Sequence, residues 1–254
     1  MPKKLILRES FHQFIFYMTA VFLSLLSIKW ISAGFEFLIF SNKEGEPRDL
    51  LAHWTEQTYV NNGINPYRLA APTLDLPQSN IGAAHFPWMR SFISGGLLYS
   101  PDWPLVRYHY ALIQALSLLV IAWFVWGFLK GYGFRSRLIL VLSATACSSI
   151  FTNLWVGQLA IILVAALFLV LKFGKVHFSI SGILLGFSLI KPTLTAYFFP
   201  AVVFFGGWKI ALIALLYIVA ATIDVLARTQ TGMFEWLAEV QFAPGKKHSF
   251  CKHF

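Results

Sequence analysis

Long apolar runs separated by short polar connections dominate the hydrophobicity pattern of this chain. Seven runs are long or apolar enough to be candidate membrane helices: Phe11–Ile31, Tyr108–Leu129, Leu138–Trp155, Leu159–Leu171, Phe178–Ile190, Leu194–Phe205 and Trp208–Leu226. A helix needs about 20 apolar residues to cross the hydrocarbon core, and three of the runs are shorter. The two short runs flanking Lys191–Pro192 form either one kinked helix or two short helices beside a water-filled cavity, where irregular backbone is tolerated.

Composition identifies lipid as the solvent for most of the chain. Hydrophobic residues make up 57% of the 254 residues and charged residues 12%, against about 25% charged in soluble domains. We therefore predict an all-α, polytopic membrane protein with about seven transmembrane helices. Residues 1–240 form a single transmembrane domain, and residues 241–254 form an atypical tail. The first run follows a basic start that also resembles a signal peptide, but its length favours an uncleaved span.

Basic residues predict the orientation of the spans. The formal charge of +9 is attributed to basic residues in cytoplasmic loops and not to nucleic-acid binding. With seven spans, one side receives nearly all the basic residues of the short connections: Lys3, Lys4, Arg8, Lys130, Arg135, Arg137, Lys172, Lys175 and Lys209. That side is predicted to be cytoplasmic, together with the N-terminus, in the cell membrane. The segment 41–107 and the turns at Asn153–Gln158 and Lys191–Pro192 are then external.

The external segment 41–107 begins with a candidate helix from Arg48 to Val60. Helical spacing places four polar side chains on one of its faces: Asp49, His53, Glu56 and Gln57. This pattern predicts a short helix lying on the bilayer surface, or one that simply turns a polar face to water. Gly63 is expected to end the helix, and Asn65–Pro66 to form a turn.

Spacing in this segment resembles glycosyltransferase family 87, the polyprenyl-phosphate-mannose-type membrane enzymes of GT-C architecture. Asp49 is followed by Gly63, Pro66 and Tyr67, in an order similar to the family's first external loop. "HFPW" (85–88) resembles its Tyr-Pro-Pro element imperfectly. "NLWVGQLAIIL" is similar to its Gly-Gln turn, and "GILLGFSLIKPTLTAYFFPAVVFF" to its Gly-rich helix ending in a lysine, here Lys191. The resemblance covers roughly residues 10 to 240.

The resemblance implies transfer of a hexose, expected to be mannose, from a polyprenyl-phosphate donor to a hydroxyl of a glycolipid or glycan acceptor. Such a reaction needs a base for the hydroxyl proton and positive charge beside the departing phosphate. Asp49 is the predicted base; a helix cap or interfacial anchor is the alternative. Lys191 is predicted to face the phosphate or, alternatively, to snorkel to the interface.

Further residues are candidates for substrate binding at this site. Arg68 or Arg90 is expected to share the phosphate role. The other candidates are His53, beside the base or the sugar, Gln158 at the Gly157 turn, and the rings of Tyr67 and Trp88. Each has a structural alternative: a solvated histidine, a helix cap or an interfacial anchor.

Other features restrict the chemistry. The histidines show no metal-ligand spacing, so no metal or cofactor is predicted. A divalent ion bound by Asp49 and Glu56 is the alternative. Cys147 lies in an apolar run, so we expect no disulfide with Cys251. Family members are longer, and an ending at residue 254 raises the alternative of an inactive truncated fragment. A transporter or flippase using Lys191 is the remaining alternative.

Overall fold

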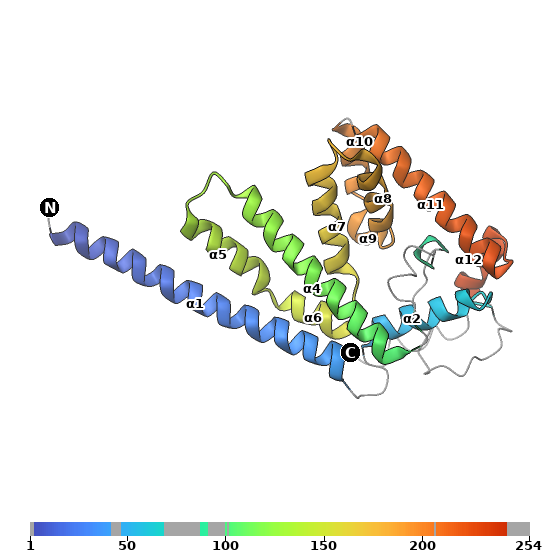
Figure 1. Ribbon diagram of the computed structural model, residues 1–254, viewed down its shortest axis with the longest axis horizontal. Helices are drawn as coiled ribbons and strands as arrows, with labels where there is room; N and C mark the ends of the chain where they lie inside the picture. Colours follow the sequence, from blue (N-terminus) through green and yellow to red (C-terminus); the bar gives the residue numbers. More distant parts are fainter. Residues whose placement is uncertain are drawn as a thin grey trace.

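The computed structural model describes residues 3–41, 47–68, 87–90, 100, 102–205 and 207–242, and all the regular structure in these ranges is helical (Figure 1). The helices are α1 (Lys3–Phe40), α2 (Arg48–Asn61), the 3₁₀ helix η1 (Pro87–Arg90), α4 (Trp103–Phe128), α5 (Phe134–Thr145), α6 (Ser148–Val156), α7 (Ala160–Phe173), α8 (Phe178–Ser188), α9 (Pro192–Thr195), α10 (Phe198–Phe204), α11 (Trp208–Thr229) and α12 (Met233–Phe242). The all-α prediction is confirmed in the described part of the chain.

Four helical segments are long and apolar enough to cross a membrane: Ser10–Phe40, Trp103–Phe128, Phe134–Val156 and Trp208–Thr229. Two more apolar helices, α7 and α8, are shorter. Many large apolar side chains on these helices are exposed, as expected for surfaces that face lipid. The segment 134–156 is interrupted at Ala146–Cys147, where α5 ends and α6 begins. These helices support the prediction of a membrane protein.

Glycines set how closely the helices approach. Gly182 and Gly186 lie one turn apart on α8, where it packs along α11. A β-carbon at Gly186 would lie 2.7 Å from Cδ1 of Tyr217 and 2.9 Å from the carbonyl oxygen of Ala214. This is the small-xxx-small pattern that lets membrane helices pack backbone to backbone.

Arg107 joins α4 to the end of α1. Its Nε donates to the carbonyl oxygen of Leu38 at 2.7 Å, and its two terminal nitrogens donate to those of Ser41 and Phe37 at 2.9 and 3.1 Å. The last carbonyls of a helix have no partner within the helix and carry partial negative charge. The buried guanidinium satisfies them, so α1 ends in a defined place beside α4.

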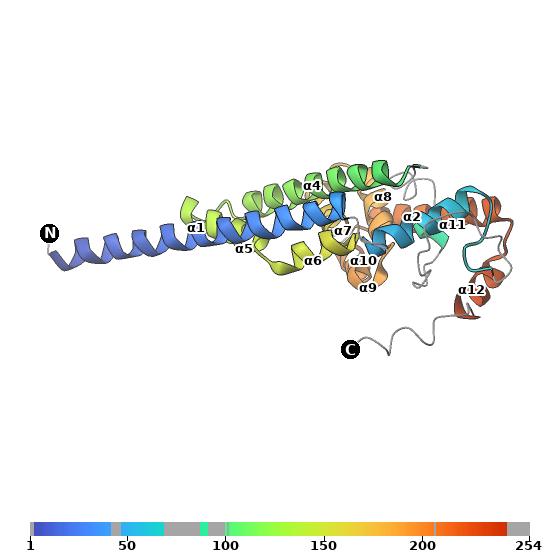
Figure 2. The same cartoon turned by 90° about the horizontal axis from the view of Figure 1, so that it is seen from below.

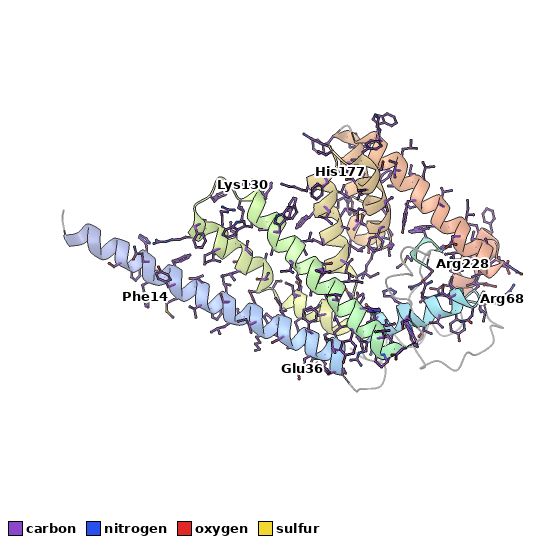
Figure 3. All side chains as sticks on the ribbon, viewed as in Figure 1. Phe14, Glu36, Arg68, Lys130, His177 and Arg228 are labelled. Carbon is purple, nitrogen blue, oxygen red and sulfur yellow. The ribbon has the colours of Figure 1, made fainter. Side chains whose placement is uncertain are left out.

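The connections of the bundle lie at two opposite ends (Figure 1). At the first, which we call the basic end, lie the α4–α5, α7–α8 and α10–α11 connections. At the second, which we call the polar end, lie the end of α1, α2, the α6–α7 turn and the end of α11. Figure 3 labels Lys130 and His177 at the basic end and Glu36 and Arg68 at the polar end. Seen from below in Figure 2, the chain forms a flat, elongated layer, with α12 below it.

Candidate functional site

The first turn of α2 rests on the Gly157 turn between α6 and α7. Gly157 has a φ of 76°, a left-handed conformation that favours glycine. A β-carbon there would lie 2.6 Å from Cβ of Leu50 and 3.1 Å from its backbone nitrogen. Only glycine therefore allows this approach, which places Asp49, the residue before Leu50, beside the turn.

Two side chains from α4 hold the same turn from the other side. The hydroxyl of Tyr110 donates to the carbonyl oxygen of Gly157 at 3.0 Å, and Nε2 of Gln114 donates to that of Gln158 at 2.7 Å. The half-buried carboxylate of Asp49 interacts electrostatically with Tyr110. Asp49 therefore lies beside a turn that includes Gln158, another predicted site residue, and buried polar side chains of α4 bond to the backbone carbonyls of that turn.

Sequence reasoning did not find Tyr110 and Gln114. Both are fully buried, and they stand one helical turn apart in an otherwise apolar span. Polar groups at such positions are costly unless they have partners, and they often mark functional sites. This spacing was the signal that could have identified them.

The polar face of α2 is buried in protein, contrary to the alternative in which it faces water. His53, Glu56 and Gln57 are all buried, because η1 covers them. Arg90 of η1, which is 2% exposed, bonds to the carboxylate of Glu56, which is 0% exposed. Its Nη1 and Nη2 also contact the carbonyl oxygen and Nδ1 of His53, at 3.2 and 2.9 Å. A helix over the predicted residues is confirmed, and it ends at Asn61, just before the left-handed Gly63, with a φ of 76°. Its predicted position on the bilayer surface stays a prediction.

This burial changes the role expected of Arg90. Its guanidinium is engaged by Glu56 and His53 and is inaccessible to solvent, so it holds α2 instead of offering a free charge to phosphate. Removing one partner of such a buried pair typically costs about 3–5 kcal/mol.

Lys191 lies at the predicted helix break. α8 ends at Ser188 and α9 begins at Pro192, so Lys191 is the residue that precedes the short helix. Its side chain is half-buried. The hydroxyl of Thr195 donates to the carbonyl oxygens of Ser188 and Lys191, at 2.7 and 3.1 Å, and so satisfies backbone groups that the break leaves open.

Tyr67 and Arg68 lie beyond the opposite end of α2, a helix about 20 Å long at 1.5 Å per residue. The ring of Tyr67 is 3% exposed and meets Trp236 of α12 edge to face, with ring centroids 5.7 Å apart. Arg68 pairs with Glu235 and Glu239 of α12, at 2.9 and 3.5 Å. These two predicted substrate contacts therefore belong to the packing of α12 and do not join the Asp49 cluster.

The surroundings of Glu239 in this second cluster change its pKa. Burial raises the pKa of its carboxyl group, while Arg68 and a hydrogen bond from Asn65 act in the opposite direction. Among the described residues, no group of three histidine, cysteine or acidic side chains is placed to hold a metal ion.

Comparison with protein-family models, curated proteins and solved structures finds no match to this chain. The likeness to glycosyltransferase family 87 thus stays a prediction that depends on the residues quoted above.

Proposed function

We propose that this protein is a membrane glycosyltransferase that transfers a hexose, with mannose as the first candidate, from a polyprenyl-phosphate donor to an acceptor hydroxyl. The observation that carries the proposal is the position of Asp49. Asp49 is half-buried beside the glycine turn at the end of an apolar bundle, and the buried side chains of Tyr110 and Gln114 bond to the same turn. Such a carboxylate is a reasonable general base for chemistry at a lipid headgroup.

In the proposed reaction, the acceptor hydroxyl gives its proton to Asp49 while its oxygen attacks the anomeric carbon of the donor. The bond between that carbon and the phosphate oxygen breaks, and its electron pair leaves with the phosphate. Lys191, at the α8–α9 break, stabilises the added negative charge. Attack opposite the leaving group inverts the anomeric configuration.

The proposed topology has seven spans: α1, α4, α5–α6, α7, α8, α9–α10 and α11. The polar end is external and the basic end, with the N-terminus, is cytoplasmic. The basic residues of the short connections between helices lie at the basic end, which supports this orientation. Several of them lie over aromatic rings, as residues at a membrane interface do: Arg137 over Trp126 at 4.1 Å and Lys172 over Trp123 at 5.6 Å.

Substitution of Asp49 by Asn tests the function. Purified protein in lipid nanodiscs is given a radiolabelled polyprenyl-phosphate mannose and an extract of membrane glycolipids as acceptors. We expect Asp49→Asn to reduce transfer about 10²–10⁴-fold, the usual contribution of a general base, while donor binding persists. Glu36→Gln, which removes an exposed acid at the same end, should transfer at the wild-type rate. Equal transfer by wild type and Asp49→Asn would reject Asp49 as the base.

A lipid flippase is a second candidate, favoured by one observation. Two spans of this topology are interrupted, between α5 and α6 and between α9 and α10, and paired breaks are typical of transporters. A flippase would move the labelled donor across a vesicle membrane without forming a glycosylated product. Product analysis in the same assay therefore separates the two functions.

A further inference from the structure

The short helix η1 contacts both parts of the proposed site. On one side, Arg90 bonds to Glu56 and His53 of α2, and Nε2 of Gln57 donates to the carbonyl oxygen of Arg90 at 3.3 Å. On the other side, Nε1 of Trp88 donates to the carbonyl oxygen of Leu189 at 3.3 Å. Leu189 stands two residues before Lys191. A four-residue helix thus links the helix of Asp49 to the break that carries Lys191.

The contact with Arg90 also orients the ring of His53. A guanidinium only donates hydrogen bonds, so the nitrogen that faces it, Nδ1, must accept. The ring proton then lies on Nε2. His53 follows Asp49 by four residues, and side chains at this spacing share a helix face. Arg90 therefore organises the same face of α2 that carries the proposed base.

We propose that Trp88 and Arg90 are positioning residues that together set the placement of Asp49 relative to Lys191. The inference rests on the proposed function for the roles of those two residues. Its physical basis is that transfer requires base, sugar and phosphate to be aligned, and a misplacement of about 1 Å costs on the order of 10²-fold in rate. Separate helices carry Asp49 and Lys191, so only contacts between helices can maintain the alignment.

Two conservative substitutions separate the halves of the link. Trp88→Phe keeps an aromatic ring but removes the bond to Leu189, which should loosen Lys191. We expect the donor KM to rise about fivefold, the effect of one hydrogen bond, with kcat nearly unchanged. Arg90→Lys keeps the charge but loses the forked contacts to α2. We expect kcat to fall about tenfold or more, with the donor KM nearly unchanged.

Arg228→Lys is the matched control, because the ion pair of Arg228 with Asp224 lies within α11 and is not one of the hydrogen bonds by which η1 links α2 to the Lys191 break. This substitution should leave kcat and the donor KM unchanged. Rates are expressed per active molecule, so that a loss of folded protein is not counted as a loss of alignment. If Trp88→Phe and Arg90→Lys lower only the amount of active protein, with kcat and KM unchanged, the residues are merely structural and the proposal is overturned.

A distance measurement tests the link without catalysis. Spin labels are placed at Arg48→Cys and Thr193→Cys, both at exposed positions, after replacement of Cys147 and Cys251 by serine. We expect one narrow distance distribution in the parent protein and in Arg228→Lys, and a broadened one in Trp88→Phe and Arg90→Lys. Unchanged distributions in both variants would overturn the positioning role. Failure of wild-type transfer with broadened distributions would instead reject the proposed function alone.

Discussion

The two ends of the molecule differ in the residues that surround their charged side chains. At the basic end, Arg137 lies over Trp126, and Lys209 lies over Trp208 and Phe178, both at 5.7 Å. Acidic residues with described side chains are on elements of the polar end instead: Glu36, Asp49, Glu56, Asp102, Asp224, Glu235 and Glu239. Cations resting on aromatic rings suit a lipid headgroup layer, whereas mixed charges in contact can build a site.

The backbone differs between the ends as well. Short connections join regular helices at the basic end, while the polar end holds the left-handed Gly157 turn and the buried helix α2. Irregular backbone at membrane depth is tolerated only where protein or water satisfies its polar groups. Tyr110 and Gln114 do this for the Gly157 turn. The basic end therefore joins regular helices by simple connections, whereas the polar end holds the irregular backbone and the residues of the proposed site.

Labelling of single cysteines gives the largest effect, because access from one side of a membrane is nearly all or none. Tyr132→Cys marks the basic end and Asn62→Cys the polar end, both at exposed positions. In intact cells of a cysteine-free background, a membrane-impermeant maleimide should label Asn62→Cys and leave Tyr132→Cys unlabelled. Permeabilised cells provide the control, since both positions should then react. The reverse pattern would invert the proposed orientation.

Gly157→Val should uncouple α2 from the polar end. The substitution introduces strain at a positive φ and a clash with Leu50, each costing about 1–3 kcal/mol. We expect a clearly lower midpoint of thermal unfolding in detergent and weak transfer activity. Gly127→Val is the matched control, because a β-carbon there meets nothing within 4 Å. Equal midpoints for the two variants would mean that the turn does not hold α2.

Gly186→Ala tests the packing that runs between the two ends. Its β-carbon would press on the carbonyl oxygen of Ala214 and on Tyr217, so α8 must move away from α11. Such overpacking typically costs about 1–3 kcal/mol, and thermal unfolding should report it as a moderate loss of stability. Gly131→Ala, in open space in the α4–α5 connection, should unfold like wild type. A stable Gly186→Ala would show that α8 and α11 can separate without loss.

Glu239 should give the smallest effect, a dependence of α12 docking on pH. Its pKa is raised in the folded protein, chiefly by burial, so the folded state binds the proton more tightly than the unfolded chain. The stabilisation is complete below the unfolded pKa and is lost as pH rises through the higher folded value. Fluorescence of the buried Trp236 should therefore report weaker docking as pH rises. Glu239→Gln, which cannot ionise, should lack this dependence. A pH profile identical to that of the wild type would contradict the prediction.

Local features of the chain could be predicted well. Apolar runs predicted the positions of α4, α7, α8 and α11 to within a few residues. Glycine and proline predicted the end of α2 at Gly63 and the break at Lys191–Pro192. The interruption at Ala146–Cys147 was not predicted, since neither residue is a strong helix breaker.

Contacts between distant segments could not be predicted in the same way. Arg90 and Glu56 are 34 residues apart, and Tyr67 and Trp236 come from opposite halves of the chain. The same polar spacing on α2 is compatible with a solvated face or a buried one, and periodicity cannot separate them. Only the docking of η1 on α2 decides between the two.

By itself, the sequence determined the helical, lipid-facing character of the protein, the break at Lys191–Pro192, and the concentration of basic residues in alternate short connections. These properties depend on residues close together in the chain, through hydrophobic period, backbone freedom and the order of charges. The tertiary structure alone decided that Asp49 lies beside the Gly157–Gln158 turn, that Arg90 is an internal partner of α2, and that Tyr67 and Arg68 pack against α12. Those outcomes depend on how helices pack across long sequence separations, where burial and hydrogen bonding select one arrangement among several that the local pattern allows.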